Sequence, residues 1–468
     1  MFVRPINFVD YFEILDTKTS YSANLFLYDV DNDNDIELII GNWDSGDLQN
    51  YGEADVEHSK GELSIVKYGV VWKKTTVDGI VSCISAGKIT NKHFADIIVF
   101  CTNCICNFFQ IVLLKNEETG ESCQLLKTHE QIVAPNAKNI VIEDIDNDGV
   151  NEVIVGFTDR AVRVYKWQQN IKNIDESGCL VEIIKWELCN QIGGLTIHCS
   201  PKHGIQVLAS LTGGCYAVLF WESLVDENGQ EGKVPFINYK QMKDEYKDNL
   251  NADIRSEIIG NIRRCNLQAN KTCDSVDNRD GKCQPPYLAV CTIDGQLMLL
   301  DENEKIWQVH LGRGELFGLS KVDVTNNDAE EVVICSWEGV TYIINHHKEI
   351  ARFSPKHQCQ AFLSGNFAIA PGIDQPVMIY STFDNSIIIY YNLNLTRIPA
   401  RSLLQDLSEP LRNKLKALKI DVNNNAEMQK FLRDIVYKFP ISNRISDTND
   451  FFESECRFPI GKMVKKQN

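Results

Sequence analysis

The sequence predicts an all-β protein, a seven-bladed β-propeller with a short helical C-terminal tail. Three observations predict it: a strand–turn–strand unit recurs seven times, its spacing suits four-stranded blades, and the apolar pattern becomes helical after residue 400. We therefore expect two domains, the propeller over residues 1–399 and a helical extension over residues 400–468.

The repeated unit is a β-branched apolar run, a short turn and a second β-rich run. The clearest copy has its two runs at residues 153–156 and 162–167. A hairpin of two short strands cannot bury both of its faces, whereas four-stranded blades stacked in a closed ring bury both and leave no exposed edge. The seven copies begin near residues 38, 97, 153, 207, 288, 332 and 377.

One step between copies is much longer than the others, because residues 222–286 interrupt the repeat. This stretch is rich in Asp, Glu, Lys and Asn and shows little periodicity. We interpret it as an insertion between blades with no regular structure. A loop that binds a partner protein is the alternative.

The tail has leucines at steps of three and four residues, as on one face of a helix. We expect an amphipathic helical segment that packs on the propeller, and a pair of helices that docks a partner is the alternative. The leucines are Leu404, Leu407, Leu411, Leu415 and Leu418.

The composition argues against several functional classes. The formal net charge is −17 without a local cluster of Lys and Arg, so we expect no nucleic-acid partner. No apolar run reaches the roughly 18 residues of a membrane helix, so we expect no direct insertion into a membrane. The N-terminus lacks a signal-peptide pattern, and many of the 16 cysteines lie in strand-like runs. We therefore expect a cytoplasmic protein with free thiols.

One acidic loop, at residues 144–152, has the chemistry of a calcium site and leads directly into a strand. Carboxylates at its positions 1, 3, 5 and 9 can converge on a hard cation, with a backbone carbonyl at position 7 and Gly149 at the sharp turn. The predicted ligands are Asp144, Asp146, Asp148, Val150 through its carbonyl, and Glu152.

A second loop, at residues 29–37, repeats this pattern with Asn34 in place of the glycine. The loop at 323–331 keeps the frame with fewer carboxylates, and the loop at 88–96 has lost the pattern. Two interpretations therefore stay open, a calcium site and a hydrogen-bonded turn that needs no metal. The predicted ligands of the second loop are Asp29, Asp31, Asp33, Asp35 and Glu37.

An acidic loop that runs into a strand is the FG-GAP arrangement, and whole blades around it resemble one family. Residues 135–167, 258–262, 289–295 and 321–344 closely resemble the integrin-alpha FG-GAP repeat-containing family of the KICSTOR complex. The resemblance implies a non-catalytic scaffold that binds other protein subunits. It also implies recruitment of a GTPase-activating complex to the lysosomal surface, which restrains TOR kinase signalling in response to nutrients.

Two rival functions are a propeller hydrolase and an extracellular calcium-binding lectin or adhesion domain. The sequence contains no Walker A loop, HExxH or GxSxG motif, so we expect no enzymatic activity and name no catalytic residue. Extensive disulfides would favour the extracellular alternative.

Overall fold

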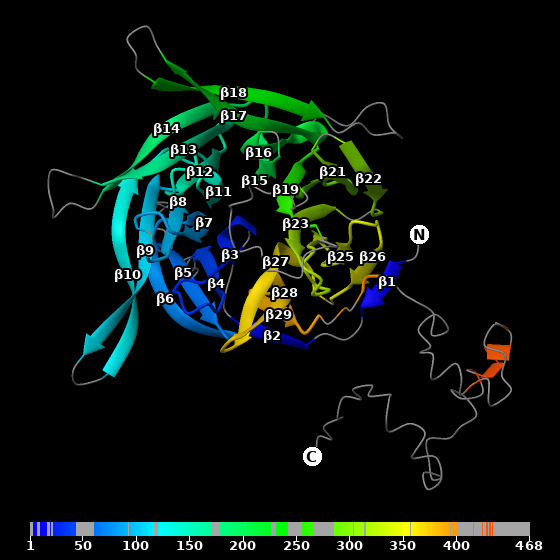
Figure 1. Ribbon diagram of the computed structural model, residues 1–468. Helices are drawn as coiled ribbons and strands as arrows, with labels where there is room; N and C mark the ends of the chain where they lie inside the picture. The colour runs from blue at the N-terminus through cyan, green and yellow to red at the C-terminus, as the bar shows by residue number, and fades with distance from the viewer. Residues whose placement is uncertain are drawn as a thin grey trace, which may run out of the picture. The chain divides into compact units, whose positions relative to one another are not determined.

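The computed structural model shows one ring of β-sheets (Figure 1). The chain forms two compact units, Met1–Pro399 and Ala400–Asn468. The structure describes residues 3–6, 10–15, 19, 22–43, 60–91, 93–116, 120–169, 178–201, 203–225, 231–241, 254–264, 285–302, 304–312, 315–355, 357–393, 395, 397–399, 415, 424, 427, 428, 430, 431 and 433.

The first four blades follow the chain in order, each an antiparallel sheet of four sequential strands. Their strands are β3 (Leu25–Tyr28), β4 (Glu37–Trp43), β5 (Lys60–Lys67) and β6 (Val70–Asp78); β7 (Val81–Gly87), β8 (Asp96–Cys101), β9 (Ile105–Asn116) and β10 (Gly120–Ile132); β11 (Ala137–Glu143), β12 (Glu152–Phe157), β13 (Ala161–Gln168) and β14 (Cys179–Glu187); and β15 (Ile192–Ser200), β16 (Gly204–Leu211), β17 (Cys215–Val225) and β18 (Glu231–Gln241).

The last three blades complete the ring, and the N-terminal strands join two of them. Two short 3₁₀ turns lie in the first part of the chain, η1 (Ser22–Asn24) before β3 and η3 (Thr212–Gly214) between β16 and β17. The strands are β19 (Ser256–Ile262), β20 (Tyr287–Thr292), β21 (Gln296–Asp301) and β22 (Glu304–His310); β23 (Leu316–Val322), β24 (Glu331–Ser336), β25 (Thr341–Ile344) and β26 (Ile350–Phe353), extended by β1 (Val3–Ile6); and β27 (Cys359–Ala370), β28 (Ile373–Thr382) and β29 (Ser386–Tyr391), extended by β2 (Asp10–Leu15).

The ring closes by pairing the start of the propeller with its end. Strand β2 pairs antiparallel with β29 and becomes the outer strand of the seventh blade, as the blue and orange-yellow strands of Figure 1 show. The ring of Phe12 stacks on that of Tyr391 with 4.5 Å between centroids. Strand β1 adds a parallel fifth strand beside β26. The seven-bladed prediction is confirmed, and pairing between the two ends of the propeller holds its last blade.

The predicted hairpins are the second and third strands of the seven blades. Strand β12 shows why they were recognisable, since all six of its residues are buried. A second strand has a neighbouring blade on each face, so both sets of side chains must be apolar and the strand is a continuous hydrophobic run. The buried clusters lie mainly between blades, where the faces of adjacent sheets meet.

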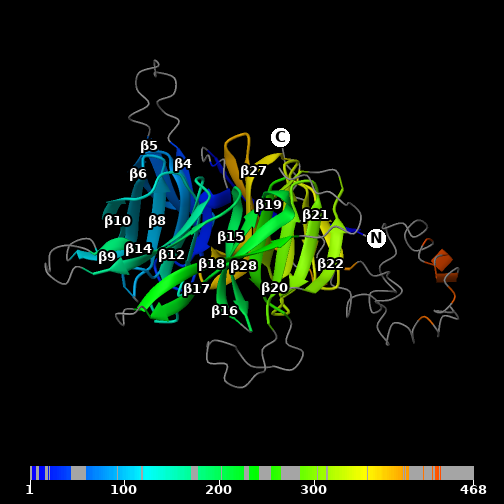
Figure 2. The same cartoon turned by 90° about the horizontal axis from the view of Figure 1, so that it is seen from above.

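The predicted insertion at residues 222–286 is too broad and is corrected by the structure. It contains the end of β17 and the whole of β18 and β19, which are regular blade strands. Figures 1 and 2 show β17 and β18 as a long ribbon on the outer rim of the ring. Strand β18 is largely exposed and carries Pro235, and Gly260 interrupts β19, so neither has a long apolar run. The alternative of a partner-binding loop falls largely on residues 226–230, 242–253 and 265–284, outside the described residues.

The predicted helical tail falls mostly on residues outside those described. Of residues 400–468, seven are described, and all of these except Asn424 are in helical conformation. They define no complete helix, so the tail stays a prediction. Across the described part of the chain, no helix is both long and apolar enough to cross a membrane.

Candidate functional site: the acidic loops

The acidic loops occupy equivalent places in three blades. Each joins the innermost strand to the second strand: β3 to β4, β11 to β12 and β23 to β24. A reduced copy joins β7 to β8. Because strand direction alternates in the same way in every blade, these four connections lie on one face of the ring.

The aspartate at position 1 shapes each loop through hydrogen bonds to the backbone. Asp144 accepts the N–H groups of Asp148 and Gly149 at 3.1 and 2.8 Å. Asp29 and Asp323 accept the equivalent pairs of N–H groups at 2.8–3.3 Å. Side-chain to backbone bonds of this kind stabilise a turn without metal.

Position 6 of each loop has a left-handed backbone, as expected from Gly149 at the sharp turn of the third-blade loop. Gly149 has φ of 81°, and Asn34 and Asp328 hold the equivalent place at 70° and 63°. Glycine adopts this conformation without strain, and Asn and Asp tolerate it better than most residues. The turn therefore survives where the glycine has been replaced.

The acid at position 9 is the buried anchor of each loop. Glu152 accepts the N–H of Ile145 at 3.0 Å, and Glu37 accepts the N–H of Val30 at the same distance. Glu331 accepts the N–H of Val324 at 2.9 Å. All three glutamates are buried, so each satisfies a backbone donor that would otherwise lack a partner inside the protein.

Two lysines lie among the carboxylates. The Nζ of Lys67 is 2.7 Å from a carboxylate oxygen of each of Asp31, Asp33 and Glu37. The Nζ of Lys166 is 3.2, 2.5 and 2.8 Å from the corresponding oxygens of Asp146, Asp148 and Glu152. The lysines come from the third strands, β5 and β13, and their side chains are only 10 and 21% exposed.

The charges of each cluster stabilise one another. Burial alone would lower the pKa of Lys67, but its hydrogen bonds to Asp31 and Asp33 and its contact with Glu37 raise it above its usual value. Lys166 has a raised pKa for the same reasons. Burial raises the pKa of Glu37 to about 7, and Lys67 opposes that rise. Both lysines therefore stay charged at neutral pH.

The structure brings together most of the predicted ligands. Oxygen atoms of Asp29, Asp31 and Asp33 lie within 4.8 Å of one another, as do those of Asp144, Asp146 and Glu152. Asp148 joins the second cluster through Lys166, and Glu37 joins the first through Lys67. Two predicted residues make other contacts. Asp35 accepts hydrogen bonds from Tyr68 and Gly372, and the N–H of Val150 donates to Asp148.

The two lysines were not predicted from the sequence. Each lysine lies in the third strand of its blade, whereas the loop comes before the second strand. The pairing register of β4 with β5, and of β12 with β13, brings the lysine next to the loop. The available signal was a lysine near the end of the third strand, directly after the apolar residue that pairs with the start of the second strand. The occurrence of a lysine at this position in two blades would have strengthened the signal.

The loops also connect neighbouring blades. Each makes a hydrogen bond to the blade that precedes it around the ring. These bonds are from Gly372 N–H to Asp35 at 2.9 Å, from the side-chain amide of Asn151 to the Lys88 carbonyl at 3.0 Å, and from Arg263 N–H to Glu330 at 2.9 Å.

An aromatic cluster lies at the opposite face of the ring. Trp337 and Phe383 occupy the turns after β24 and β28 and are 38 and 54% exposed. The ring of Trp337 lies 4.8 Å from that of Phe317 and 6.4 Å from that of Phe383. Exposed Trp and Phe side chains held by a rigid scaffold are typical contact residues of protein interfaces.

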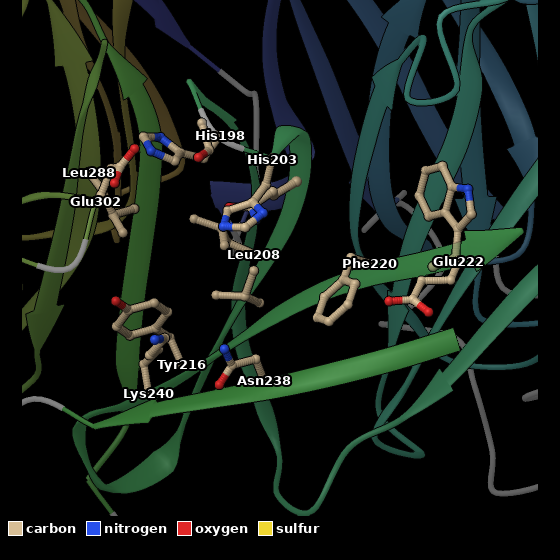
Figure 3. A pocket seen from close by; sticks show the side chains of 14 residues that line it. His198, His203, Leu208, Tyr216, Phe220, Glu222, Asn238, Lys240, Leu288 and Glu302 are labelled. Carbon is tan, nitrogen blue, oxygen red and sulfur yellow. The ribbon is translucent and has the colours of Figure 1, made fainter. Parts of the chain in front are cut away.

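A hollow of about 540 Å³ lies between the fourth and fifth blades (Figure 3). The buried His198 borders it, and its Nε2 has no hydrogen-bond partner in the structure. Most of the lining of the hollow comes from the fourth blade, with Leu288 and Glu302 from the fifth, and the sequence did not predict it because no short motif marks these residues. The lining mixes aromatic side chains with charges of both signs: Tyr216, Phe220, Trp221, Glu222, Lys240 and Glu302.

The described cysteines bear on the choice between compartments. All twelve of them are free, and Cys83, Cys101, Cys106, Cys291, Cys335 and Cys359 are buried. Within the described part of the chain, disulfides thus give no support to the extracellular alternative.

Comparison with protein families gives one match that covers most of the propeller. The model of the family described as integrin-alpha FG-GAP repeat-containing protein 2 matches residues 66–395, which is more than half of the chain. The match runs from the first blade through the seventh.

Curated relatives and solved structures extend this comparison. The Mus musculus protein named KICSTOR complex protein ITFG2 is 29% identical over 443 residues, which cover 89% of this chain and 93% of the relative. The Bos taurus protein of the same name is 27% identical over 401 residues, covering 83 and 72%. The BBS1N chain, crystallised with ARL6DN, is similar with a TM-score of 0.51 at 11% identity, covering 86% of this chain and 99% of that one. This likeness concerns the fold alone.

Proposed function

This chain belongs to the integrin-alpha FG-GAP repeat-containing protein 2 family, and from that membership we propose that it is a non-catalytic scaffold subunit of a KICSTOR-like complex. Its role would be to help recruit a GTPase-activating complex to the lysosomal surface and so to restrain TOR kinase signalling when nutrients are scarce. The supporting observation is the extent of the match. Alignment with the mouse relative covers nearly the whole of both chains, so the similarity is not that of one shared domain.

The surface of the propeller suits a scaffold. The backbone of a closed ring is already ordered before a partner binds. The energy gained when the partner buries a few exposed side chains is therefore not offset by a large entropic cost. Trp337 and Phe383 are such side chains, from two adjacent blades. These two side chains lie on the face opposite to the acidic loops. The contacts that the loops make between blades therefore leave the two aromatic side chains accessible.

The carboxylates of the acidic loops suit a structural role better than a catalytic one. A catalytic acid or base must exchange a proton with a substrate that reaches it. Glu37 and Glu152 are instead fully buried and engaged by a backbone N–H and a lysine. We therefore propose that the chain has no turnover of its own.

Deletion of the chain in its own cells tests this function. In the deleted cells we expect the GTPase-activating complex to leave lysosomes and TOR substrates to stay phosphorylated after amino acids are withdrawn. Reintroducing the full chain should restore both responses. Unchanged lysosomal recruitment and unchanged TOR signalling in the deleted cells would overturn the proposed role.

A further inference from the structure

The acidic loops raise the question of which cation balances their carboxylates. A resident calcium ion would need six to eight oxygen ligands at 2.3–2.6 Å around one point. In the first and third blades, that point is taken by a lysine ammonium at 2.5–3.2 Å from the side chains at loop positions 3, 5 and 9. An ammonium and a divalent ion of like charge cannot share this space, so the described residues do not fit a resident calcium ion.

The two lysines occupy the same register position. Leu38, the residue after Glu37, pairs with Val66, and Lys67 follows Val66. Val153, the residue after Glu152, pairs with Tyr165, and Lys166 follows Tyr165. The sequences around these lysines differ, yet both ammonium groups reach the same three loop positions.

The residue at this register position varies with the charge of the loop. In the second blade, where only Asp96 remains of the acids, the equivalent residue is Gln110, and its amide donates to Asp96 at 2.6 Å. In the sixth blade, Thr325 replaces the acid at position 3 and donates to Glu331, and the equivalent residue is Asn345. The register position therefore carries a lysine where loop positions 3, 5 and 9 are all acids. It carries a neutral amide in these two blades, where they are not, and the Asn345 side chain bonds to His347 and Glu349 beyond its strand.

We propose that Lys67 and Lys166 replace the calcium ion of an FG-GAP loop, so that each acidic loop is a structural turn with a covalently attached cation. The loops then hold the same shape at any calcium concentration. Because they also connect neighbouring blades, the propeller keeps its geometry without a calcium signal. This inference concerns the loops and does not depend on the scaffold function.

Calcium binding by the full-length chain tests this proposal. We expect no calcium-dependent rise in the melting temperature of the wild-type protein up to about 5 mM calcium, a range in which extracellular loops with Kd values of about 10⁻⁴–10⁻³ M would respond. Lys166→Met leaves the carboxylates without their cation. This variant should melt at a lower temperature in EGTA and recover with calcium. Lys185→Met removes a lysine from an exposed ion pair of the same blade and is the matched control.

Three results would overturn the proposal. The first is wild-type calcium binding in the millimolar range or tighter that Asp146→Asn abolishes. The second is a folded Lys166→Met protein that gains no response to calcium. If Lys166→Met does not fold, the double variant Lys166→Met with Asp146→Asn removes one charge of each sign and should regain folding in EGTA. Failure of the double variant to regain it is the third.

Discussion

The Nζ of Lys166 lies 2.8 Å from Oε1 of Glu152, at the buried end of the acidic loop in the third blade. The second oxygen of Glu152 accepts the N–H of Ile145 at 3.0 Å. One carboxylate therefore neutralises the lysine and also caps the backbone of the loop. The pair links the third strand of the blade to the connection that enters its second strand.

Glu152→Ala should lower the free energy of unfolding by about 3 kcal/mol, because it leaves a buried ammonium with one partner fewer and a buried N–H with none. Urea unfolding followed by circular dichroism measures this change. Glu187→Ala is the control, since Glu187 also pairs with a lysine of this blade but is 77% exposed. Its expected effect is much smaller, because water screens an exposed ion pair. Equal effects of the two variants would contradict the buried role of Glu152.

Glu331→Gln should change how stability depends on pH. Burial raises the pKa of Glu331 to about 7, above its unfolded value near 4.5, so the folded protein holds this proton more tightly. Its contribution to stability is therefore full below about pH 4.5 and is lost as the pH rises to about 7. Glutamine keeps an oxygen for Val324 and an amide that can donate to Thr325, and it does not ionise.

Unfolding in urea at pH 5 and pH 8 measures this effect. Relative to wild type, Glu331→Gln should gain up to about 3 kcal/mol between the two pH values. Glu338→Gln, in an exposed turn after β24, should follow the wild type. A Glu331→Gln protein whose stability depends on pH as the wild type does would contradict the raised pKa.

Phe12→Ala should weaken closure of the ring, because Phe12 holds β2 on the seventh blade by stacking on Tyr391. The half-buried ring should contribute about 1–3 kcal/mol, less than a fully buried one. Thermal unfolding would show a lower melting temperature, whereas Leu15→Ala at the exposed end of the same strand should change little. A Phe12→Ala protein as stable as wild type would show that the stacking of Phe12 on Tyr391 is dispensable for closure.

The sequence predicted the strands that are buried on both faces and missed several that are not. The run from Val153 to Gly156 was evident because neighbouring blades cover both of its sides. Strand β18 was missed because its residues are mostly half-buried or exposed. The acidic loops were evident because their residues are consecutive, but the role of Lys166 depends on strand register, which local pattern does not specify.

Trp337→Ala combined with Phe383→Ala should reduce retention of partner subunits at least tenfold, because the two rings form an exposed aromatic cluster on adjacent blades. Quantitative pull-down of the folded variant measures this loss, with circular dichroism to check the fold. Phe94→Ala is the control, since Phe94 is 55% exposed on the loop between β7 and β8, at the opposite face. Unchanged retention by the double variant would place the contact surface elsewhere on the chain.

The most direct test of the scaffold function is co-purification of the full chain with the other subunits of its KICSTOR-like complex. The tagged chain is co-expressed with those subunits and purified at physiological salt, in parallel in EGTA and in 1 mM calcium (about the Kd of weak extracellular loops). We predict that the subunits are retained in equal and stoichiometric amounts in both buffers. Retention in calcium alone would contradict the lysine inference and leave the scaffold function standing. A chain that elutes without the subunits in both buffers would contradict the scaffold function itself.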